Sequence, residues 1–259
     1  MYNTILLEKE QGVATITLNR PDVYNAINDE ISFELQAALK AVTKNPEVRV
    51  VVLTGAGQKA FCSGQDLKAD RGNTIDFKKS LEKRYNPIIR LMRKMPKPII
   101  CRLNGVAAGA GCSFALACDL IVAAEHACLI EVFVNIGLVL DSGSSYFLPR
   151  LVGSQKAFEL ATTGKKVTAK DALELGMVNK VVDFDQLDTA IKTYTDFYAN
   201  APTKAIGLMK KMLNKSGNAS LEEMLEYEMY AQTIAGASKD YTEGVTAFKE
   251  KRKPLFKGE

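Results

Sequence analysis

Apolar and polar residues alternate in the first segment of the chain, and this alternation indicates β-structure. The alternation runs from Leu6 to Leu18, turns through Gly12 and stops at Pro21, so it predicts an early hairpin of strands. Asn28 then opens a stretch whose apolar residues recur at helical spacing, which predicts a helix. Those residues are Ile31, Leu35, Ala38, Leu39 and Val42.

Two continuous apolar runs, Val48–Leu53 and Pro98–Leu103, are typical of strands buried on both faces. The polar stretch Lys68–Lys83 between them predicts mobile surface. After the second apolar run comes Asn104–Gly111, a turn rich in glycine and alanine. It leads into CSFALACDLIVAA (112–124), which we expect to begin as a buried helix and end as a strand.

Amphipathic helical patterns replace strand signals after Gly143, including AKDALELGMVNKVV (169–182). From Leu187 onward the pattern predicts helices almost throughout, with a basic tail at Lys249–Lys257. Strand and helix units followed by helices predict an α/β core with a helical C-terminal region.

Composition narrows the class of protein. The 259 residues are 47% hydrophobic and 25% charged, which suits one main globular domain. A net charge of +4, from 34 basic and 30 acidic residues, predicts no nucleic-acid partner but allows a small phosphorylated ligand. Met1–Glu10 lacks a signal-peptide pattern, and no apolar run approaches the roughly 20 residues that span a bilayer. We therefore expect a cytoplasmic protein with no membrane partner.

The cysteines and the one histidine exclude several kinds of chemistry. Five cysteines without paired CxxC spacing predict buried thiols rather than disulfides or a zinc site. His126 is expected at a surface turn, and one histidine in that context gives no support to a Ser-His-Asp triad.

Three segments could carry chemistry. Two glycine-rich turns, Phe61–Asp66 and Asn104–Gly111, each follow a predicted buried strand and could leave backbone N–H groups free for an anion or an oxyanion. They could equally be tight turns that only permit close packing. The third is Asp141, a carboxylate in an apolar stretch before a Ser/Gly turn, which could act as an acid/base group or merely cap the next helix.

Together these segments resemble the enoyl-CoA hydratase/isomerase (crotonase) superfamily over nearly the whole chain. The likeness is carried by ITLNRPDVYNAIND, VVLTGAGQKAFCSGQDL, KPIICRLNGVAAGAGCSFALACDLIVAAE, IGLVLDSGSSYFLPRLVG and EGVTAFKEKRKPLF. The resemblance implies a ClpP-like spiral of ββα units at residues 1–195 and a helical trimerisation region at 196–259. It also implies an acyl-CoA thioester substrate with no separate cofactor and no metal, and a homotrimer or dimer of trimers.

The resemblance also implies roles for particular residues. By motif, the backbone N–H groups of Gln65 and Ala110 would hold the thioester oxygen. The two glutamates of the hydratases are replaced here by Ser113 and Phe133, and neither side chain moves a proton at neutral pH. Asp141 stands where certain isomerases and the 4-chlorobenzoyl-CoA dehalogenase place a catalytic aspartate.

Further residues are implied to bind the substrate. Ser63 and Asp66 would lie near the nucleotide, Lys251 near a phosphate, and Phe133 beside the acyl group. A solvated basic tail is an equal explanation for Lys251. Phe248 and Phe256 are expected to pack the C-terminal tail, and Phe133, Val139 and Leu140 to raise the pKa of Asp141.

We therefore predict an acyl-CoA isomerase that moves a double bond or rearranges a ring epoxide through an enolate, with Asp141 as its catalytic group. Within the family the likeness is greatest to isomerases that act on 1,2-epoxyphenylacetyl-CoA in phenylacetate breakdown. The chain contains no tryptophan, which disfavours the dehalogenase. The alternatives are an enoyl-CoA hydratase and, in another class, a non-catalytic CoA- or RNA-binding scaffold.

Overall fold

The computed structural model describes residues 2–68 and 76–259, and its strands form two sheets. The six-stranded sheet has the order β1 (Ile5–Glu10), β2 (Val13–Leu18), β3 (Val50–Gly55), β5 (Ile99–Leu103), β7 (Leu120–Ala124) and β10 (Lys180–Val182). The four-stranded sheet has the order β4 (Ala60–Cys62), β6 (Val106–Ala108), β8 (Cys128–Ile130) and β9 (Val167–Thr168). Only the β1–β2 and β8–β9 pairs are antiparallel.

The chain visits the two sheets alternately, which produces the spiral. Strands β3, β5 and β7 enter the larger sheet, and each is followed by a strand of the smaller sheet, β4, β6 or β8. All six residues of β3 are buried, as expected for a strand covered on both faces. The fold is the crotonase spiral that the sequence predicted.

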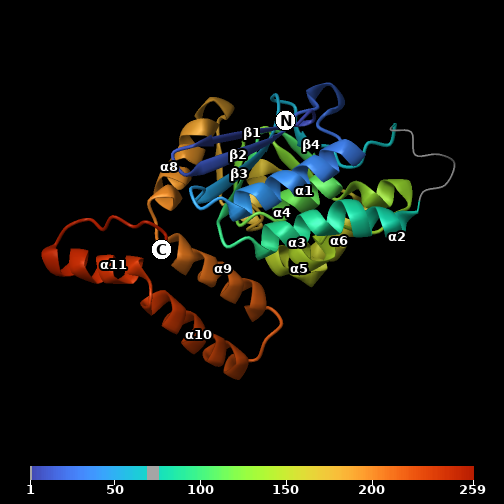
Figure 1. The fold of residues 1–259 in the computed structure, drawn as a ribbon. Helices are drawn as coiled ribbons and strands as arrows, with labels where there is room; N and C mark the ends of the chain where they lie inside the picture. The colour runs from blue at the N-terminus through green and yellow to red at the C-terminus, as the bar shows by residue number, and fades with distance from the viewer. Residues whose placement is uncertain (1, 69–75) are drawn as a thin grey trace.

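Helices cover these sheets and form the C-terminal third, as Figure 1 shows. Asn28 caps the first of them, because its side chain accepts a hydrogen bond from Ile31 N–H. The helices are α1 (Asp29–Lys44), α2 (Phe77–Ser80), α3 (Asn86–Lys94), α4 (Ala110–Leu116), α5 (Ser144–Val152), α6 (Ser154–Thr163), α7 (Ala169–Glu174), α8 (Leu187–Ala199), α9 (Thr203–Ser216), α10 (Leu221–Gly236) and α11 (Lys239–Glu250). Shorter turns of helix are η1 (Pro21–Val23), the π-helical η2 (Leu81–Tyr85), η3 (Val132–Ile136) and η4 (Phe184–Gln186). None of the helices in the described ranges is long and apolar enough to cross a bilayer.

Three local predictions need correction. The stretch predicted as mobile surface is helical from Phe77, where α2 begins and runs into η2; residues 69–75 of that stretch lie outside the described residues. The segment AKDALELGMVNKVV is helical only to Glu174, and its end forms β10. The short strands of the smaller sheet, β4, β6, β8 and β9, were also missed, and β4 and β6 lie partly or wholly inside the predicted glycine-rich turns. Like β10, these strands pair with edges made elsewhere in the chain, which a local pattern does not contain.

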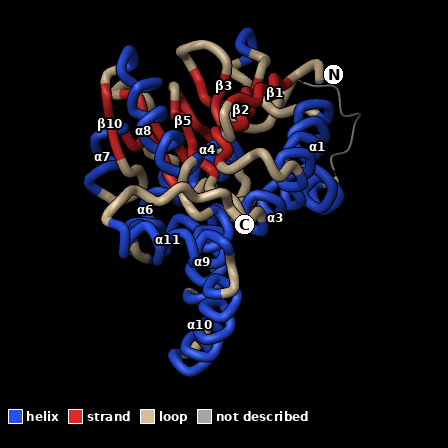
Figure 2. Tube along the Cα trace, turned by 60° about the vertical axis from the view of Figure 1, so that its left-hand side comes forward, coloured by secondary structure: helices blue, strands red, loops and turns tan. Residues whose placement is uncertain are grey.

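Helices α9, α10 and α11 project away from the sheets in Figure 1, and α10 extends farthest from them in Figure 2. The chain then turns back along α11, since Lys257 N–H and Gly258 N–H donate to the Asp240 carboxylate over 2.7 and 2.8 Å. The predicted division between residues 195 and 196 falls inside α8 and remains a prediction.

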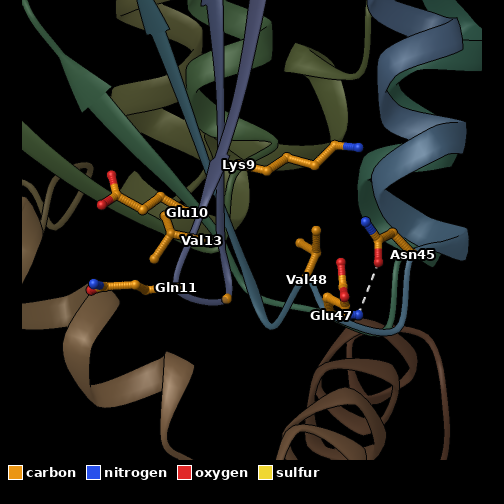
Figure 3. A pocket seen from close by; sticks show the side chains of 8 residues that line it. Lys9, Glu10, Gln11, Val13, Asn45, Glu47 and Val48 are labelled. Atoms are coloured by element: carbon orange, nitrogen blue, oxygen red, sulfur yellow. Dashed lines mark hydrogen bonds between the residues drawn. The ribbon is translucent and has the colours of Figure 1, made fainter.

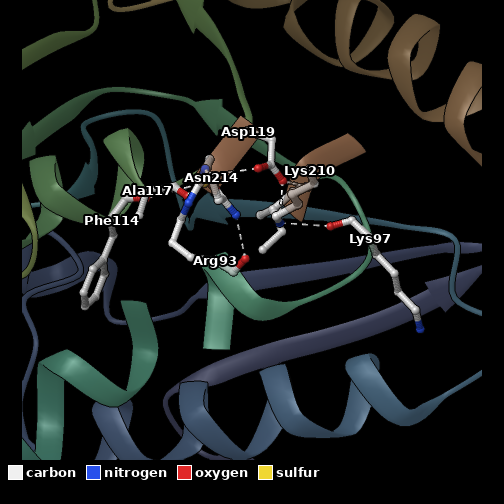
Figure 4. A network of polar contacts seen from close by, with 9 residues as sticks. Arg93, Lys97, Phe114, Ala117, Asp119, Lys210 and Asn214 are labelled. Atoms are coloured by element: carbon white, nitrogen blue, oxygen red, sulfur yellow. Dashed lines mark hydrogen bonds and ion pairs between the residues drawn. The ribbon is translucent and has the colours of Figure 1, made fainter. Parts of the chain in front are cut away.

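A buried polar network fastens α9 to the core, as Figure 4 shows. Lys210 Nζ on α9 lies 2.6 Å from Asp119 Oδ2, and Arg93 Nη1 on α3 lies 3.1 Å from Asp119 Oδ1. Lys210 also donates to the Lys97 carbonyl, and Asn214 Nδ2 to the Arg93 carbonyl, over 3.1 and 3.0 Å. Burial lowers the pKa of Lys210 while Asp119 opposes that shift. The Lys210 side chain is 6% exposed and that of Asp119 19%, so this contact holds the lysine charge largely out of water.

Replacing Lys210 with Met is expected to destabilise the protein by about 2–4 kcal/mol, because Asp119 then keeps its charge in a buried place with one partner fewer. Guanidinium unfolding measures this. The control is Lys192→Met on α8, where an exposed pair with Asp196 is removed; it is expected to cost less than about 0.5 kcal/mol. Equal shifts of the two midpoints would contradict a buried, stabilising pair at Lys210.

Candidate active site

The two glycine-rich turns meet backbone to backbone. Gly64 has φ +89°, and a Cβ placed there would lie 2.8 Å from the Ala108 carbonyl oxygen and 3.5 Å from Ala110 N. A Cβ at Gly111 would lie 2.2 Å from the Cys62 carbonyl oxygen. Any side chain would push the turns apart, so glycine is needed here for close approach as well as for the positive φ.

This contact brings together the amides of Gln65 and Ala110. Ile27 donates to the Gly64 carbonyl over 2.8 Å and accepts from Asp66 N–H over 2.9 Å, which leaves the Gln65 N–H on the other side of its strand. Ala110 begins α4, where the first amides have no intrahelical acceptor. Within the described residues neither N–H donates to another protein group. Two adjacent free donors are what a developing oxyanion needs.

Asp141 lies in the turn between η3 and α5, at a place tied to the second of these turns. Ser113, in the first turn of α4, has its Oγ 3.1 Å from the Asp141 carbonyl oxygen and 3.3 Å from that of Gly109. The Asp141 carboxylate accepts from Ser142 Oγ over 2.7 Å. Burial raises the pKa of Asp141, and the Ser142 hydrogen bond partly opposes this. A carboxyl of this kind suits proton transfer in both directions.

Phe133, Val139 and Leu140 were expected to bury Asp141 and so raise its pKa, and the structure agrees with this only in part. Phe133 is buried and its ring lies about 3.9 Å from where a Cβ of Gly109 would be, so it packs against the Ala110 turn. Val139 is 83% exposed and therefore does not contribute to the burial that raises the pKa. That part of the prediction was wrong because the residues after η3 turn outward.

The predicted nucleotide-binding residues separate into two places. Ser63 and Asp66 flank the Gln65 turn; Ser63 N–H donates to the Tyr24 carbonyl over 3.0 Å, and Asp66 forms a 2.9 Å ion pair with Arg20. Beside Tyr24 a cavity of about 380 Å³ opens between η1 and the loop joining β3 to β4. Lys251, by contrast, is an exposed residue at the C-terminal end of α11, in the projecting helices.

Of the two aromatic residues expected to pack the tail, one does so. Phe256 lies against Gly244 of α11, at 3.4 Å from the position of a Cβ there. Phe248 is 86% exposed, so its predicted packing was wrong for the single chain.

The sequence reasoning missed Glu131, a second carboxyl in this region. Glu131 precedes η3, is only 3% exposed, and has its Oε1 2.9 Å from Ser144 Oγ. Among the described residues its Oε2 has no hydrogen-bond partner. Burial raises its pKa to about 7. The available signal was its position as the only ionisable side chain between Cys128 and Leu140, in an otherwise largely apolar run.

Other features lie apart from this centre. A hollow of about 320 Å³ at the β1–β2 turn is lined by Lys9, Glu10 and Glu47 (Figure 3). It sits at the beginning of β2 and β3, whereas the two glycine turns follow β4 and β6. Among the described residues no three His, Cys, Asp or Glu side chains gather as a metal site requires; that the protein uses no metal or other cofactor stays a prediction.

Two unpaired amides in adjoining turns, and a carboxyl of raised pKa whose main chain is tied to the second turn through Ser113, are groups able to stabilise an enolate and move its proton. Comparison with known proteins agrees with this class. The family model for enoyl-CoA hydratase/isomerase matches residues 8–259. The chain belongs to the enoyl-CoA hydratase/isomerase family, and it is an enzyme of that family.

Some of the similar proteins are named isomerases and others hydratases. The chain is 42% identical to the 1,2-epoxyphenylacetyl-CoA isomerase of Escherichia coli, with 100% of each chain covered. It is 35% identical to the short-chain-enoyl-CoA hydratase of Clostridium acetobutylicum, covering 97% of this chain and 96% of that one. Its structure superposes on the enoyl-CoA hydratase of Bacillus anthracis with a TM-score of 0.94 at 33% identity, covering 99% and 100% of the two chains.

Proposed function

We propose that the protein is an acyl-CoA isomerase that uses Asp141 as its single acid/base group. The observation that carries the proposal is the anchoring of Asp141, through Ser113, to the helix that begins with the free amide of Ala110. The similarity to the isomerase of Escherichia coli supports the same reaction class.

The hydratase alternative has less support from the side chains present. By the family's motif, its two glutamates correspond to Ser113 and Phe133. Ser113 is fully buried and hydrogen-bonded, and Phe133 has no proton to exchange. Glu131 is a poor replacement for them, because it is only 3% exposed and its Oε1 contacts Ser144. Water addition needs two proton-transferring groups at the substrate, and here one is available.

The proposed reaction on a 3-enoyl-CoA has two steps. The ionised Asp141 takes a proton from carbon 2, and the electron pair of that C–H bond moves toward the thioester, whose oxygen becomes an enolate held by Gln65 N–H and Ala110 N–H. The protonated Asp141 then returns the proton to carbon 4, and the double bond is left between carbons 2 and 3. Substrate and product have the same atoms. Each fixed donor of this kind stabilises the developing charge by about 3–4 kcal/mol.

A ring epoxide of an arylacetyl-CoA would use the same groups. We propose that the carboxyl of Asp141 and the two amides assist epoxide opening and ring expansion to an oxepin-type thioester. The name of the Escherichia coli relative favours this substrate class. The nucleotide of the substrate would lie by Ser63 and Asp66, and Lys251 would meet a phosphate, supplied by its own or a neighbouring chain.

We also propose assembly as a trimer or a dimer of trimers. The projecting helices carry apolar side chains that are largely exposed in the single chain: Met209 and Leu213 on α9, and Leu221, Leu225, Met229 and Tyr230 on α10. Large apolar side chains exposed on two helices that pack together are typical of an interface.

The test of function compares two reactions in one preparation. The enzyme is expected to convert a 3-enoyl-CoA to the conjugated 2-enoyl-CoA, and to add water to crotonyl-CoA at least about 100-fold more slowly, because a second proton-transferring group is missing. Absorbance of the conjugated thioester follows both reactions. Hydration faster than migration would overturn the isomerase proposal in favour of a hydratase. Activity toward neither the 3-enoyl-CoA nor an arylacetyl-CoA epoxide would favour a non-catalytic protein.

A further inference from the structure

A buried row of four oxygen atoms links Glu131 to the main chain of Asp141. Glu131 Oε1 lies 2.9 Å from Ser144 Oγ, Ser144 Oγ lies 2.8 Å from Ser113 Oγ, and Ser113 Oγ lies 3.1 Å from the Asp141 carbonyl oxygen. Ser113 and Ser144 are fully buried. All three separations are those of O–H···O hydrogen bonds or close to them.

Counting protons shows what this row requires. Three hydrogen bonds need three protons, and the two serine hydroxyls supply two. The carbonyl at one end accepts only, so the third proton must come from the carboxyl at the other end. With a proton on Glu131, Glu131 donates to Ser144, Ser144 to Ser113, and Ser113 to the Asp141 carbonyl. With Glu131 ionised, both hydroxyls turn toward it, the Ser113 hydrogen bond to the Asp141 carbonyl is lost, and that carbonyl keeps its hydrogen bond from Ser144 N–H over 3.0 Å.

We propose that Glu131 is a positioning residue whose carboxyl proton, passed as hydrogen bonds through Ser144 and Ser113, holds the Asp141 turn against the oxyanion turn. The inference rests on the proposed function of Asp141 and deepens it. Glu131 itself does not touch substrate. Its role is to keep the Asp141 main chain in place while the side chain moves a proton.

Burial is the main cause that favours the protonated state of Glu131. Cys112 on α4 faces it, with its Sγ 3.5 Å from Oε1. Cys128 faces Cys112 in turn. Burial raises the pKa of both thiols, so both stay neutral. Burial raises the pKa of Glu131 to about 7; the hydrogen bonds to Ser144 and Cys112 oppose this shift, and the nearby Asp141 adds to it. No cation among its described neighbours offsets this.

The direction of the pH effect follows from the raised pKa. The row of hydrogen bonds is complete while Glu131 is protonated, and it is lost as the pH rises through about 7. Asp141 must be ionised to accept a proton, which sets the acidic limit of activity. We therefore expect kcat to fall on the alkaline side because of Glu131 and on the acidic side because of Asp141.

The test uses two variants that separate the proton from the packing. In Glu131→Gln the amide N–H₂ donates to Ser144 at every pH, so activity on the acidic side of 7 stays within about threefold of wild type and the alkaline fall in kcat disappears. Glu131→Leu cannot donate, and kcat falls about tenfold or more at all pH values, as for loss of a buried hydrogen bond. KM for the acyl-CoA changes little in both.

Two outcomes overturn the proposal: a Glu131→Gln enzyme that keeps the wild-type alkaline fall, or a Glu131→Leu enzyme with wild-type kcat. A second readout does not depend on turnover. Infrared spectroscopy should show a protonated-carboxyl C=O band that vanishes as the pH passes about 7, is absent from Glu131→Gln and persists in Asp141→Asn. If the band is absent from the wild type below this pH, the proposal is wrong even if the enzyme is an isomerase; if Asp141→Asn remains fully active, the function of Asp141 is wrong instead.

Discussion

Asp141→Asn is expected to lower kcat for double-bond migration by about 10³-fold and to leave KM for the acyl-CoA nearly unchanged. General acid–base groups contribute about 10²–10⁴-fold, and the proposed mechanism gives both proton transfers to this carboxyl. In the proposed complex, binding uses the amides of Gln65 and Ala110 and the nucleotide contacts, which the substitution does not alter. Steady-state kinetics with a 3-enoyl-CoA measures both constants.

A matched control separates chemistry from a general effect of losing a carboxylate. Asp188 is 82% exposed in its side chain and pairs with Arg102 at the start of α8. Asp188→Asn is expected to leave kcat unchanged. If Asp141→Asn retained wild-type kcat, another group would have to move the proton and the assignment would fail.

Gly64→Ala is expected to lower kcat by about 10²–10³-fold, the loss typical of one displaced oxyanion-hole donor. The new methyl group would meet the Ala108 carbonyl at 2.8 Å and lie near Ala110 N, at a residue with φ +89°. The turns must separate to admit it, and the Gln65 and Ala110 amides then no longer face one oxygen.

The control for this substitution is Gly176→Ala, which has a similar φ of +74° but nothing within 4 Å of the new Cβ. Gly176→Ala therefore places an alanine at a positive φ, as Gly64→Ala does, but its new methyl group meets no neighbouring atom. We expect near wild-type kcat there, and thermal melting shows whether Gly64→Ala is folded. A folded Gly64→Ala enzyme with wild-type kcat would show that the two turns do not form the oxyanion site.

Much of the fold could be predicted because it is encoded locally. The alternating segment before Pro21 forms β1 and β2, as predicted. Asn28 caps α1, and the apolar run that begins at Val48 contains the fully buried β3. Strands β9 and β10 could not be predicted, because two or three residues carry no periodicity and their pairing depends on distant edges.

In the candidate site, too, some residues could be predicted from local sequence and others could not. The residue pattern marked the two glycine-rich turns and the isolated carboxylate, but it was the family resemblance that implied roles for Gln65, Ala110 and Asp141, and these roles stay predictions. Glu131 was missed, because what makes it unusual is its contact with Ser144 and an unpaired oxygen. Those properties arise where β8, α4 and α5 meet, and only the three-dimensional arrangement brings these elements together.

The most direct measurement of the central claim is exchange of the α-protons of phenylacetyl-CoA with deuterated water, followed by mass spectrometry. The thioester has no double bond or epoxide to move, so exchange reports only proton removal and enolate stabilisation. The wild type is expected to exchange these protons and Asp141→Asn to exchange them about 10³-fold more slowly while binding equally well. Equal exchange by both proteins would contradict the assignment of Asp141 as the base beside the two amides.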